Sequence, residues 1–359
     1  MTADAEPCDA EADAEPCAAE PDWWIYRCSP EPHNGIRRLP KAPSWRSFSD
    51  GTERTDLLDP PAPTSVAGRH SRRGRNLRTF RYQAERKEIH LVNMALLLRR
   101  PLLVTGPPGV GKSTLPYSIA GELGLGPVLR WSVTSRTTLQ NGQYEYDAVG
   151  RLQDSGLLGR GQETEPPEIG HYLRLGPLGT ALLPWRIPRV LLIDEIDKSD
   201  ADFPNDLLHV FEEGEFTVRE LARLRRPTAT VMTADDEERV ELTGGRVRCH
   251  EFPLVVMTSN GEREFPPAFL RRCIRLEIHR PDRHKLARLL DALLPPSDAP
   301  ATAAYEKLVG EFLRKQDDEG AELANDQLLN AALLAQQLWA DPEERGLIVD
   351  HLLRPLNEG

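Results

Sequence analysis

The sequence predicts an α/β protein with a parallel five-stranded sheet at its core and a C-terminal helical lid domain. Short apolar runs that are typical of buried strands alternate with helical patterns as far as Pro281, and no strand pattern follows. Strands that alternate with helices form parallel β-α-β units, because each helix returns the chain to the same end of the sheet. A glycine-rich loop directly after the first strand places a phosphate-binding loop in its usual context.

The individual elements are predicted from the spacing of apolar residues. Five runs are predicted strands, at residues 102–105, 128–133, 190–193, 254–257 and 274–278. One helix begins at Glu88 and ends near Arg99, and the other core helices are at 113–123, 203–213 and 267–272. The predicted lid helices are at 284–294, 304–314, 326–339 and 343–353. The expected division is an N-terminal arm at 1–79, an α/β core at 80–280 and the lid at 281–359.

The N-terminal arm combines a low-complexity segment with aromatic clusters. Residues 3–8 and 12–17 repeat the sequence Ala-Asp-Ala-Glu-Pro-Cys, and such a polar stretch punctuated by proline is expected to be disordered. Two aromatic clusters follow, at residues 23–26 and 45–48. We expect them either to form a small satellite core or to dock as an extended arm onto this chain's core or a neighbour's.

The formal net charge of −11 argues against duplex nucleic acid as the main partner. The charge is unevenly spread, since residues 1–22 carry eight acids and no base. Residues 69–87 instead carry seven arginines and one lysine against a single acid, Glu85. Such a run is more often a solvated face or a partner for acids elsewhere than a phosphate contact, and phosphate binding stays open as the alternative.

The cysteines and the apolar segments indicate the cellular compartment in which the protein is expected to lie. The five cysteines contain no Cys-x-x-Cys pair, and their scattered spacing suits a reducing environment. The N-terminus lacks the basic and then apolar pattern of a signal peptide. No stretch approaches the ~18 uninterrupted apolar residues of a membrane span. We therefore expect no membrane association and a cytoplasmic location.

The loop after the first strand fits the pattern G-x-x-x-x-G-K-[ST] of a phosphate-binding loop. Its glycines let backbone N–H groups converge on phosphate oxygens, and the following helix points its positive end at the same anion. Lys112 is expected to reach the β- and γ-phosphates, and Ser113 to ligate Mg²⁺. ATP is favoured over GTP because no Asn-Lys-x-Asp sequence is present. The predicted ATP-binding residues are Gly106, Pro107, Pro108, Gly109, Val110, Gly111, Lys112, Ser113, Thr114 and Asp194.

Polar residues follow two of the other predicted strands. Asp194 and Glu195 end the strand at 190–193, where an open α/β sheet binds its ligands. Asp194 is the second candidate Mg²⁺ ligand, through water, and Glu195 is the candidate that polarises the attacking water. Asn260 follows the strand at 254–257 and is expected to hydrogen-bond the γ-phosphate or the lytic water. The alternative for Asn260 is a simple turn position.

Paired arginines lie at the end of the predicted helix at 267–272. An arginine supplied to a neighbour's site stabilises the charge of the transition state for phosphoryl transfer. Arg272 is the preferred candidate for this role, with Arg271 as a second contact. The alternative is an internal salt bridge.

These motifs in this order resemble the AAA+ superfamily, and within it the MoxR and dynein-related branch. The resemblance covers about Phe80 to the C-terminus and is carried by GPPGVGKS at 106–113, VLLIDEIDK at 190–198, EEGEF at 212–216, VVMTSN at 255–260 and FPPAFLRRC at 265–273. It implies ATP hydrolysis, a ring that is usually hexameric, and chaperone-like remodelling of a protein client. It also implies a partner with a von Willebrand A-domain in many cases.

One position departs from the family pattern. The lid helix of the family usually opens with an arginine that contacts the γ-phosphate, and Gln327 stands at the comparable place here. Either another lid arginine substitutes, or the lid closes more weakly on ATP. A nucleotide-gated scaffold with little turnover is therefore one alternative to a remodelling ATPase, and the NTPase subunit of a nucleic-acid restriction or defence complex is another.

Two segments between the core strands are long or irregular. Residues 130–179 are long for a crossover, and long loops tend to be functional. We expect this segment to line a central pore or a client-facing surface, with an insertion that packs on its own core as the alternative. Residues 231–248 are predicted to form a hairpin and are the second candidate for a client-facing surface.

Overall fold

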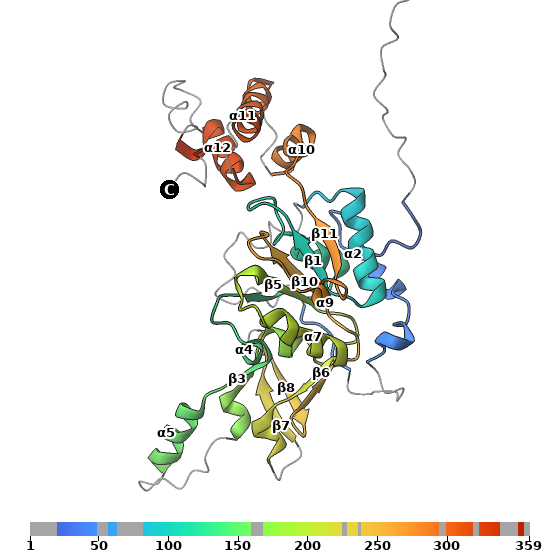
Figure 1. Ribbon diagram of the computed structural model, residues 1–359, viewed down its shortest axis with the longest axis vertical. Helices are drawn as coiled ribbons and strands as arrows, with labels where there is room; N and C mark the ends of the chain where they lie inside the picture. Colours follow the sequence, from blue (N-terminus) through green and yellow to red (C-terminus); the bar gives the residue numbers. More distant parts are fainter. Residues whose placement is uncertain are drawn as a thin grey trace, which may run out of the picture.

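The computed structural model describes residues 20–48, 57–62, 82–158, 168–224, 228–235, 238–293, 299–318, 323–337 and 351–354. Its central sheet is parallel and has five strands in the order β11-β1-β10-β5-β2 (Figure 1). These strands are β1 (Leu102–Thr105), β2 (Leu129–Ser132), β5 (Val190–Asp194), β10 (Leu254–Ser259) and β11 (Ile274–Glu277). The parallel five-stranded core that the sequence predicts is confirmed.

The register of the sheet brings the polar strand ends to one edge. Thr105 of β1 pairs with Ser259 of β10, and Ser132 of β2 pairs with Asp194 of β5. β5 and β10 are buried along their whole length, which explains their continuous apolar runs, since both faces of a parallel sheet are covered. The loops that follow β1, β5 and β10 therefore meet above the same edge.

Helices pack on the sheet close to where the sequence predicts them. They are α2 (Arg86–Leu98), α3 (Leu115–Leu123), α7 (Phe203–Glu213) and α9 (Pro267–Leu270). α3 begins two residues later than predicted, with Pro116 in its first turn, and Gly124 ends it in the left-handed conformation at φ 63°. Glycine adopts this conformation without a steric penalty, so the sequence also specifies where α3 ends.

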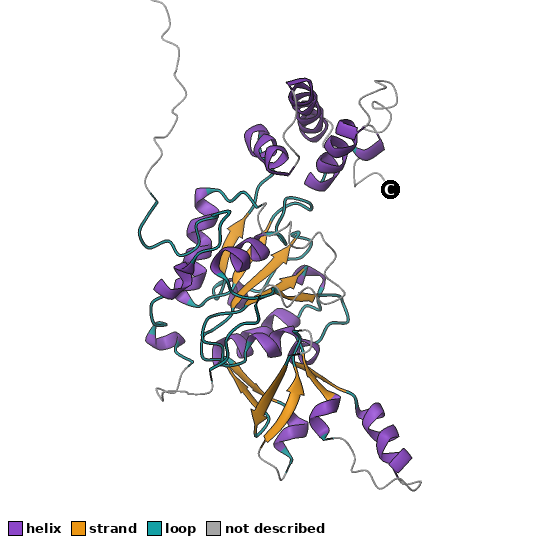
Figure 2. Cartoon of the chain, turned by 180° about the vertical axis from the view of Figure 1, so that it is seen from behind, coloured by secondary structure: helices purple, strands orange, loops and turns teal. Residues whose placement is uncertain are grey.

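A second, smaller sheet lies at the opposite end of the core from the C-terminal helices (Figures 1 and 2). Its strands pair in the order β3-β4-β7-β8 and are β3 (Tyr144–Tyr146), β4 (Leu173–Leu175), β7 (Thr228–Met232) and β8 (Arg239–Thr243). β7 and β8 form an antiparallel pair, so part of the hairpin predicted at 231–248 is present, but the pair begins at Thr228 and ends at Thr243. A two-stranded antiparallel sheet of β6 (Glu215–Thr217) and β9 (Arg246–Arg248) lies beside it.

The long segment at 130–179 contributes to this second sheet and its short helices. The helices are α4 (Leu139–Gln143), α5 (Ala148–Leu158) and α6 (Pro177–Ala181), and α8 (Arg219–Ala222) lies further along the chain. Leu173, Leu175 and Leu178 belong to the same buried cluster as Leu191 and Ile193 of the central sheet. The segment thus packs into the main core, while α5 projects from it with Val149 and Leu152 exposed (Figure 1).

Three helices follow the central sheet: α10 (Arg283–Leu293), α11 (Ala299–Asp318) and α12 (Asn325–Gln337). Leu286, Leu290, Phe312 and Leu328 belong to a separate buried cluster that holds them together. The fourth predicted helix, at 343–353, lies mostly outside the described residues. The division at residues 80 and 281 stays a prediction. None of the helices within the described ranges is long and apolar enough to cross a membrane.

Three residues of the first aromatic cluster in the N-terminal arm are buried against one face of the central sheet. Trp24, Ile25 and Tyr26 are at most 3% exposed and pack with residues of α2 and α3, among them Ile89. Phe48 is buried in the cluster on the other face of the sheet, whereas Trp45 is 75% exposed. Residues 24–26 are therefore an integral part of the α/β core. The acidic duplication at 3–17 and most of the arginine-rich run lie outside the described residues.

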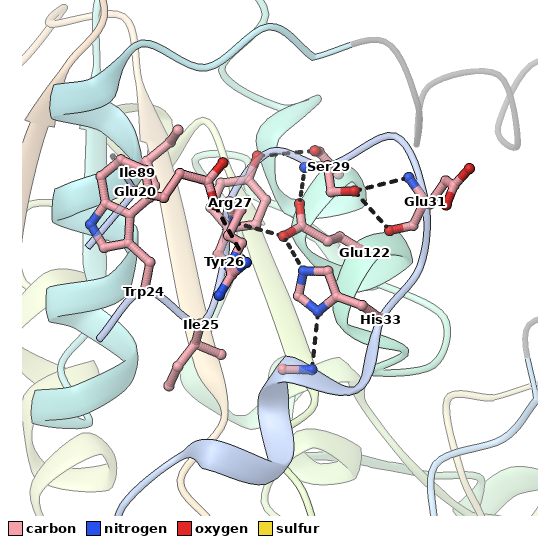
Figure 3. Close-up of polar contacts among 12 residues, drawn as sticks. Glu20, Trp24, Ile25, Tyr26, Arg27, Ser29, Glu31, His33, Ile89 and Glu122 are labelled. Carbon is pink, nitrogen blue, oxygen red and sulfur yellow. Dashed lines mark hydrogen bonds and ion pairs between the residues drawn. The ribbon is translucent and has the colours of Figure 1, made fainter. Parts of the chain in front are cut away.

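Two buried polar side chains fasten this segment to the helices. Glu122, at the end of α3, accepts hydrogen bonds from the backbone N–H groups of Arg27 (2.6 Å) and Ser29 (2.8 Å) and from His33 Nε2 (2.9 Å; Figure 3). Burial raises the pKa of Glu122, and these hydrogen bonds oppose that rise. On α2, Asn93 Oδ1 accepts from the N–H groups of Ile25 (2.7 Å) and Tyr26 (2.9 Å). Its Nδ2 donates to the carbonyl oxygen of Tyr26 at 2.7 Å.

Asn93→Ala is expected to lower the free energy of unfolding by about 3 kcal/mol. The substitution leaves two N–H groups and one carbonyl of a buried segment without partners, and each such group costs ~1–3 kcal/mol less any relaxation. Met94→Ala, at the adjacent and partly exposed position of the same helix, is the matched control and should change stability by less than about 1 kcal/mol. Urea denaturation of both variants makes the comparison. Equal losses would show that the segment is not fastened through Asn93.

Candidate functional site

A cavity of about 690 Å³ opens at the edge where the loops after β1, β5 and β10 meet. Its lining comes from the core strands, the glycine-rich loop and helices α10 and α12. The lining residues include Tyr82, Pro108 to Thr114, Arg130, Asp194, Glu195, Thr258, Asn260, Lys285, Leu289, Asn325, Asp326 and Leu329. The structure therefore brings the predicted loop, both strand-end acids and Asn260 to one place.

The glycine-rich loop has a backbone that only glycine tolerates at two positions. Gly106 has a φ of 149°, and a Cβ there would overlap the carbonyl oxygen of Ile278. Gly109 has a φ of 76°, and a Cβ there would overlap Ala324, next to the start of α12. The loop therefore wraps closely between β11 and α12. The Asn325 N–H donates to the carbonyl oxygen of Gly109 at 3.3 Å, which joins the loop to α12.

Lys112 lies at the base of the cavity and is 7% exposed. Its Nζ donates to the carbonyl oxygens of Gly106 and Pro107 and to Asn260 Oδ1, each at 2.7 Å. Burial lowers the pKa of Lys112, and the carboxylates of Asp197, Asp194 and Glu195 oppose that effect. The ammonium group thus lies among acceptors that anionic phosphate oxygens can replace.

Asp194 is surrounded by donors. Its Oδ1 accepts from the hydroxyls of Ser113 (2.7 Å) and Thr258 (2.8 Å), and its Oδ2 from Arg130 Nη2 (2.6 Å). Burial by itself raises the pKa of Asp194, but the hydrogen bonds from Ser113, Thr258 and Arg130 outweigh it and lower that pKa below its ordinary value. The side chain is therefore a carboxylate at neutral pH.

The Ser113 and Asp194 side chains fit a magnesium ion by their chemistry. Mg²⁺ prefers oxygen ligands and is usually bound through one or two protein groups together with waters and substrate phosphates. A hydroxyl and a carboxylate oxygen that are 2.7 Å apart offer two such ligands beside the glycine-rich loop. These two residues would hold the ion, as the sequence predicts.

Glu195 adopts a left-handed backbone conformation, with a φ of 62°. This conformation is uncommon for a residue with a side chain and is typical of functional positions that the surrounding fold holds in place. The Glu195 N–H donates to Thr258 Oγ1 at 2.9 Å, and its carboxylate accepts from Lys198 Nζ at 2.9 Å. The side chain is 46% exposed and lines the cavity, so it can reach a water molecule there.

Asn260 is held in position by the buried Asp197. Asp197 Oδ2 accepts from the N–H groups of Asn260 (2.8 Å) and Glu262 (3.2 Å), which fixes the loop after β10. The Asn260 amide oxygen contacts Lys112, so the predicted γ-phosphate contact lies beside the lysine that is predicted to bind the same phosphate. Asn260 is thus more than a turn residue, because its side chain points into the cavity.

Both predicted arginines lie outside the cavity lining. The Arg272 guanidinium forms an ion pair with Glu212 of α7 and also donates to the carbonyl oxygen of Ala268 at 3.2 Å. The internal salt bridge is therefore the arrangement of Arg272 within this chain, and its role at a neighbour's site stays a prediction. The Arg271 side chain is exposed and makes no hydrogen bond or ion pair with any of the residues that the structure describes.

The Gln327 side chain is turned away from the cavity. Its Nε2 donates to the carbonyl oxygens of Leu352 (3.0 Å) and Arg354 (2.9 Å), and its Oε1 accepts from the Ala324 N–H. The side chain therefore fastens α12 to the residues near the C-terminus and does not line the cavity. Asn325 and Asp326 face the cavity instead.

Sequence reasoning missed five residues of the site. Thr258 and Asp197 lie inside motifs that the sequence analysis recognised. Their positions in the sequence, close to Asn260 and Asp194, could have identified them as residues of the site. Arg130 is on β2, whose carboxyl end lies at the same edge of the sheet, so strand polarity alone could have placed it there. Tyr82 and Lys285 carry no such signal. Both bind Glu88 of α2, through Tyr82 Oη at 2.6 Å and Lys285 Nζ at 3.1 Å.

One model of a protein family matches the central part of the chain. Residues 101–273 match the family model described as an AAA domain of the dynein-related subfamily. Among solved structures, the chain is similar to domain III of the replication initiation protein DnaA from Thermotoga maritima, with 14% identity and a TM-score of 0.38 over 77% of this chain and 96% of that chain. No curated protein matched the sequence. The family match, the strand order and the loop at Gly106 to Thr114 assign residues 101–273 to the P-loop fold of the AAA+ domain.

Proposed function

We propose that this protein binds and hydrolyses Mg²⁺-ATP in the cavity, as a MoxR-like ring that remodels a partner protein. The observation that carries the hydrolytic part is the cluster of Lys112, Asp194, Glu195 and Asn260 at one edge of the sheet. Proteins with AAA+ domains typically assemble into rings, which supports the oligomeric part of the proposal. A hexamer and a partner with a von Willebrand A-domain are the finer expectations of the MoxR resemblance.

Each residue has a distinct task in this proposal. The loop amides and Lys112 bind the β- and γ-phosphates, and Ser113 and Asp194 hold the metal. When bound, Mg²⁺ neutralises the charge that develops on the phosphate oxygens. Glu195 orients a water molecule toward the γ-phosphorus and accepts its proton as the bond to the β-phosphate oxygen breaks. Asn260 positions the γ-phosphate or that water.

The test of the assembly is the mass of the full chain with and without Mg²⁺-ATP, measured by light scattering. A ring predicts a nucleotide-dependent rise to a fixed multiple of 40.3 kDa, and a sixfold multiple in the case of a hexamer. A lasting monomer in the presence of saturating ATP would contradict the ring. Lys112→Ala is the control, and it should stay at the mass seen without nucleotide.

A scaffold with little turnover is the second candidate function. Two observations favour it: the Glu195 carboxylate is bound by Lys198, and the described residues of α10 and α12 that line the cavity include no arginine. A ring that assembles with ATP but releases no phosphate would support this candidate. The arginine-rich run at 69–87 lies mostly outside the described residues, and nothing in the described part favours a nucleic-acid complex.

A further inference from the structure

Arg130 is the single arginine among the described residues that line the cavity. It lies on β2 between the buried side chains of Leu129 and Trp131, and the alternation of the strand turns Arg130 toward the site. Its side chain is 50% exposed, and its Nη2 donates to Asp194 Oδ2 at 2.6 Å. A half-exposed guanidinium therefore contacts the carboxylate that would hold the magnesium ion.

We propose that Arg130 is a phosphate-sensing residue, which holds Asp194 before the nucleotide binds and moves to the terminal phosphate of Mg²⁺-ATP. The inference rests on the proposed function, because it needs nucleotide in this cavity. It adds a role for a residue of β2 that the recognised motifs do not contain.

The electrostatics of the site favour this exchange. Asp194 carries one negative charge. Its Oδ2 accepts a hydrogen bond from the charged guanidinium of Arg130, whereas its Oδ1 accepts from two neutral hydroxyls. A divalent cation on Asp194 would reverse the sign of the local charge, because bound cations are often the largest charges in a site. The guanidinium would then be repelled by the ion and attracted by the phosphate oxygens, which arginine binds in bidentate geometry.

The described residues of α10 and α12 leave this task open. Their cavity-lining residues are Lys285, Leu289, Asn325, Asp326 and Leu329. Lys285 is held by Glu85 (2.9 Å) and Glu88 (3.1 Å), and Gln327 is turned toward residues 352 and 354. Besides Lys112, the cation among the described residues that could recognise the γ-phosphate therefore comes from the central sheet. A residue fixed to the sheet would report on the phosphate without closure of the helices.

The test compares the affinities of the full chain for ATP and ADP by calorimetry, with Mg²⁺ and with EDTA. With Mg²⁺, Arg130→Ala is expected to weaken ATP binding about ten- to hundredfold, the value of a hydrogen bond to a charged group, and to leave ADP binding unchanged. With EDTA, the same substitution leaves Asp194 uncompensated beside the phosphates and should weaken ATP and ADP binding alike. Arg130→Gln should repeat both patterns if the alanine variant folds poorly.

The outcomes separate a phosphate sensor from a structural ion pair. If Arg130→Ala weakens ATP and ADP binding equally with Mg²⁺, Arg130 only anchors Asp194. If both affinities are unchanged, Arg130 neither anchors Asp194 nor binds the phosphate. Either result overturns the inference while the proposed function stands. A wild-type chain that binds neither nucleotide would overturn both. Arg174→Ala, at an exposed position of β4 in the second sheet, is the matched control and should bind like the wild type.

Discussion

Replacement of Glu195 by glutamine is expected to lower the rate of ATP hydrolysis about 10²- to 10⁴-fold, the usual contribution of a general base. Glutamine has nearly the same shape but no negative charge, so it cannot accept the proton of the attacking water. The affinity for Mg²⁺-ATP should stay within about threefold, because the ligands of the phosphates and the metal lie elsewhere, on Lys112, Ser113 and Asp194. Phosphate release and calorimetry on the same preparation measure both quantities.

Lys198→Ala separates the loss of the carboxylate from the loss of its ion pair. Lys198 binds Glu195 at 2.9 Å, and both side chains are more than 40% exposed. Because exposed pairs contribute little to stability, the variant should fold normally and leave Glu195 free to act on water. We expect its turnover to equal or exceed that of the wild type. For the Glu195→Gln variant, a rate of ATP hydrolysis equal to that of the wild type would exclude hydrolysis by this site.

Arg271→Ala is expected to lower the turnover of the assembled protein about 10³-fold or more, the effect of an arginine supplied to a neighbouring site. The structure shifts the preference from Arg272 to Arg271. Arg272 is engaged with Glu212, whereas the Arg271 guanidinium is exposed and has no partner among the described residues. Arg272→Ala is the matched control and should reduce turnover much less. The reverse order of the two effects would restore Arg272 as the preferred residue.

A mixing experiment shows whether this arginine acts between subunits. Glu195→Gln and Arg271→Ala chains should each be nearly inactive alone. In a mixed ring, some sites combine an intact Glu195 from one chain with an intact Arg271 from its neighbour, and these sites should hydrolyse ATP. Turnover that reappears on mixing supports action in trans. No recovery, although light scattering shows mixed assemblies, would place Arg271 in a structural role.

The sequence predicts the parts of the fold that depend on local patterns. The buried strands β5 and β10 contain the continuous apolar runs at 190–193 and 254–257, and the loop at Gly106 is a motif whose backbone geometry requires glycine. The strand-end residues Asp194 and Asn260 follow from strand polarity, because parallel strands end at one edge. These are short-range signals, and the structure places them where the sequence predicts.

The second sheet and the buried N-terminal segment could not be predicted in the same way. β3 and β4 have three residues each, too few to show an alternating pattern, and their pairing joins positions that are far apart in the chain. Asn93 looks like any polar residue on a helix until Ile25 and Tyr26 are packed against it. The ion pair of Arg272 could not be predicted from local patterns, because its partner Glu212 lies 60 residues away in the chain, on α7.

Calorimetric titration of the wild-type chain with ATP and Mg²⁺ tests the central claim most directly. The account predicts one molecule of Mg²⁺-ATP bound per chain, and a loss of at least about a hundredfold in affinity in Lys112→Ala, which removes a charged donor from the phosphates. A wild-type chain without affinity for Mg²⁺-ATP under conditions in which it assembles, or a Lys112→Ala chain that binds as tightly as the wild type, would contradict it.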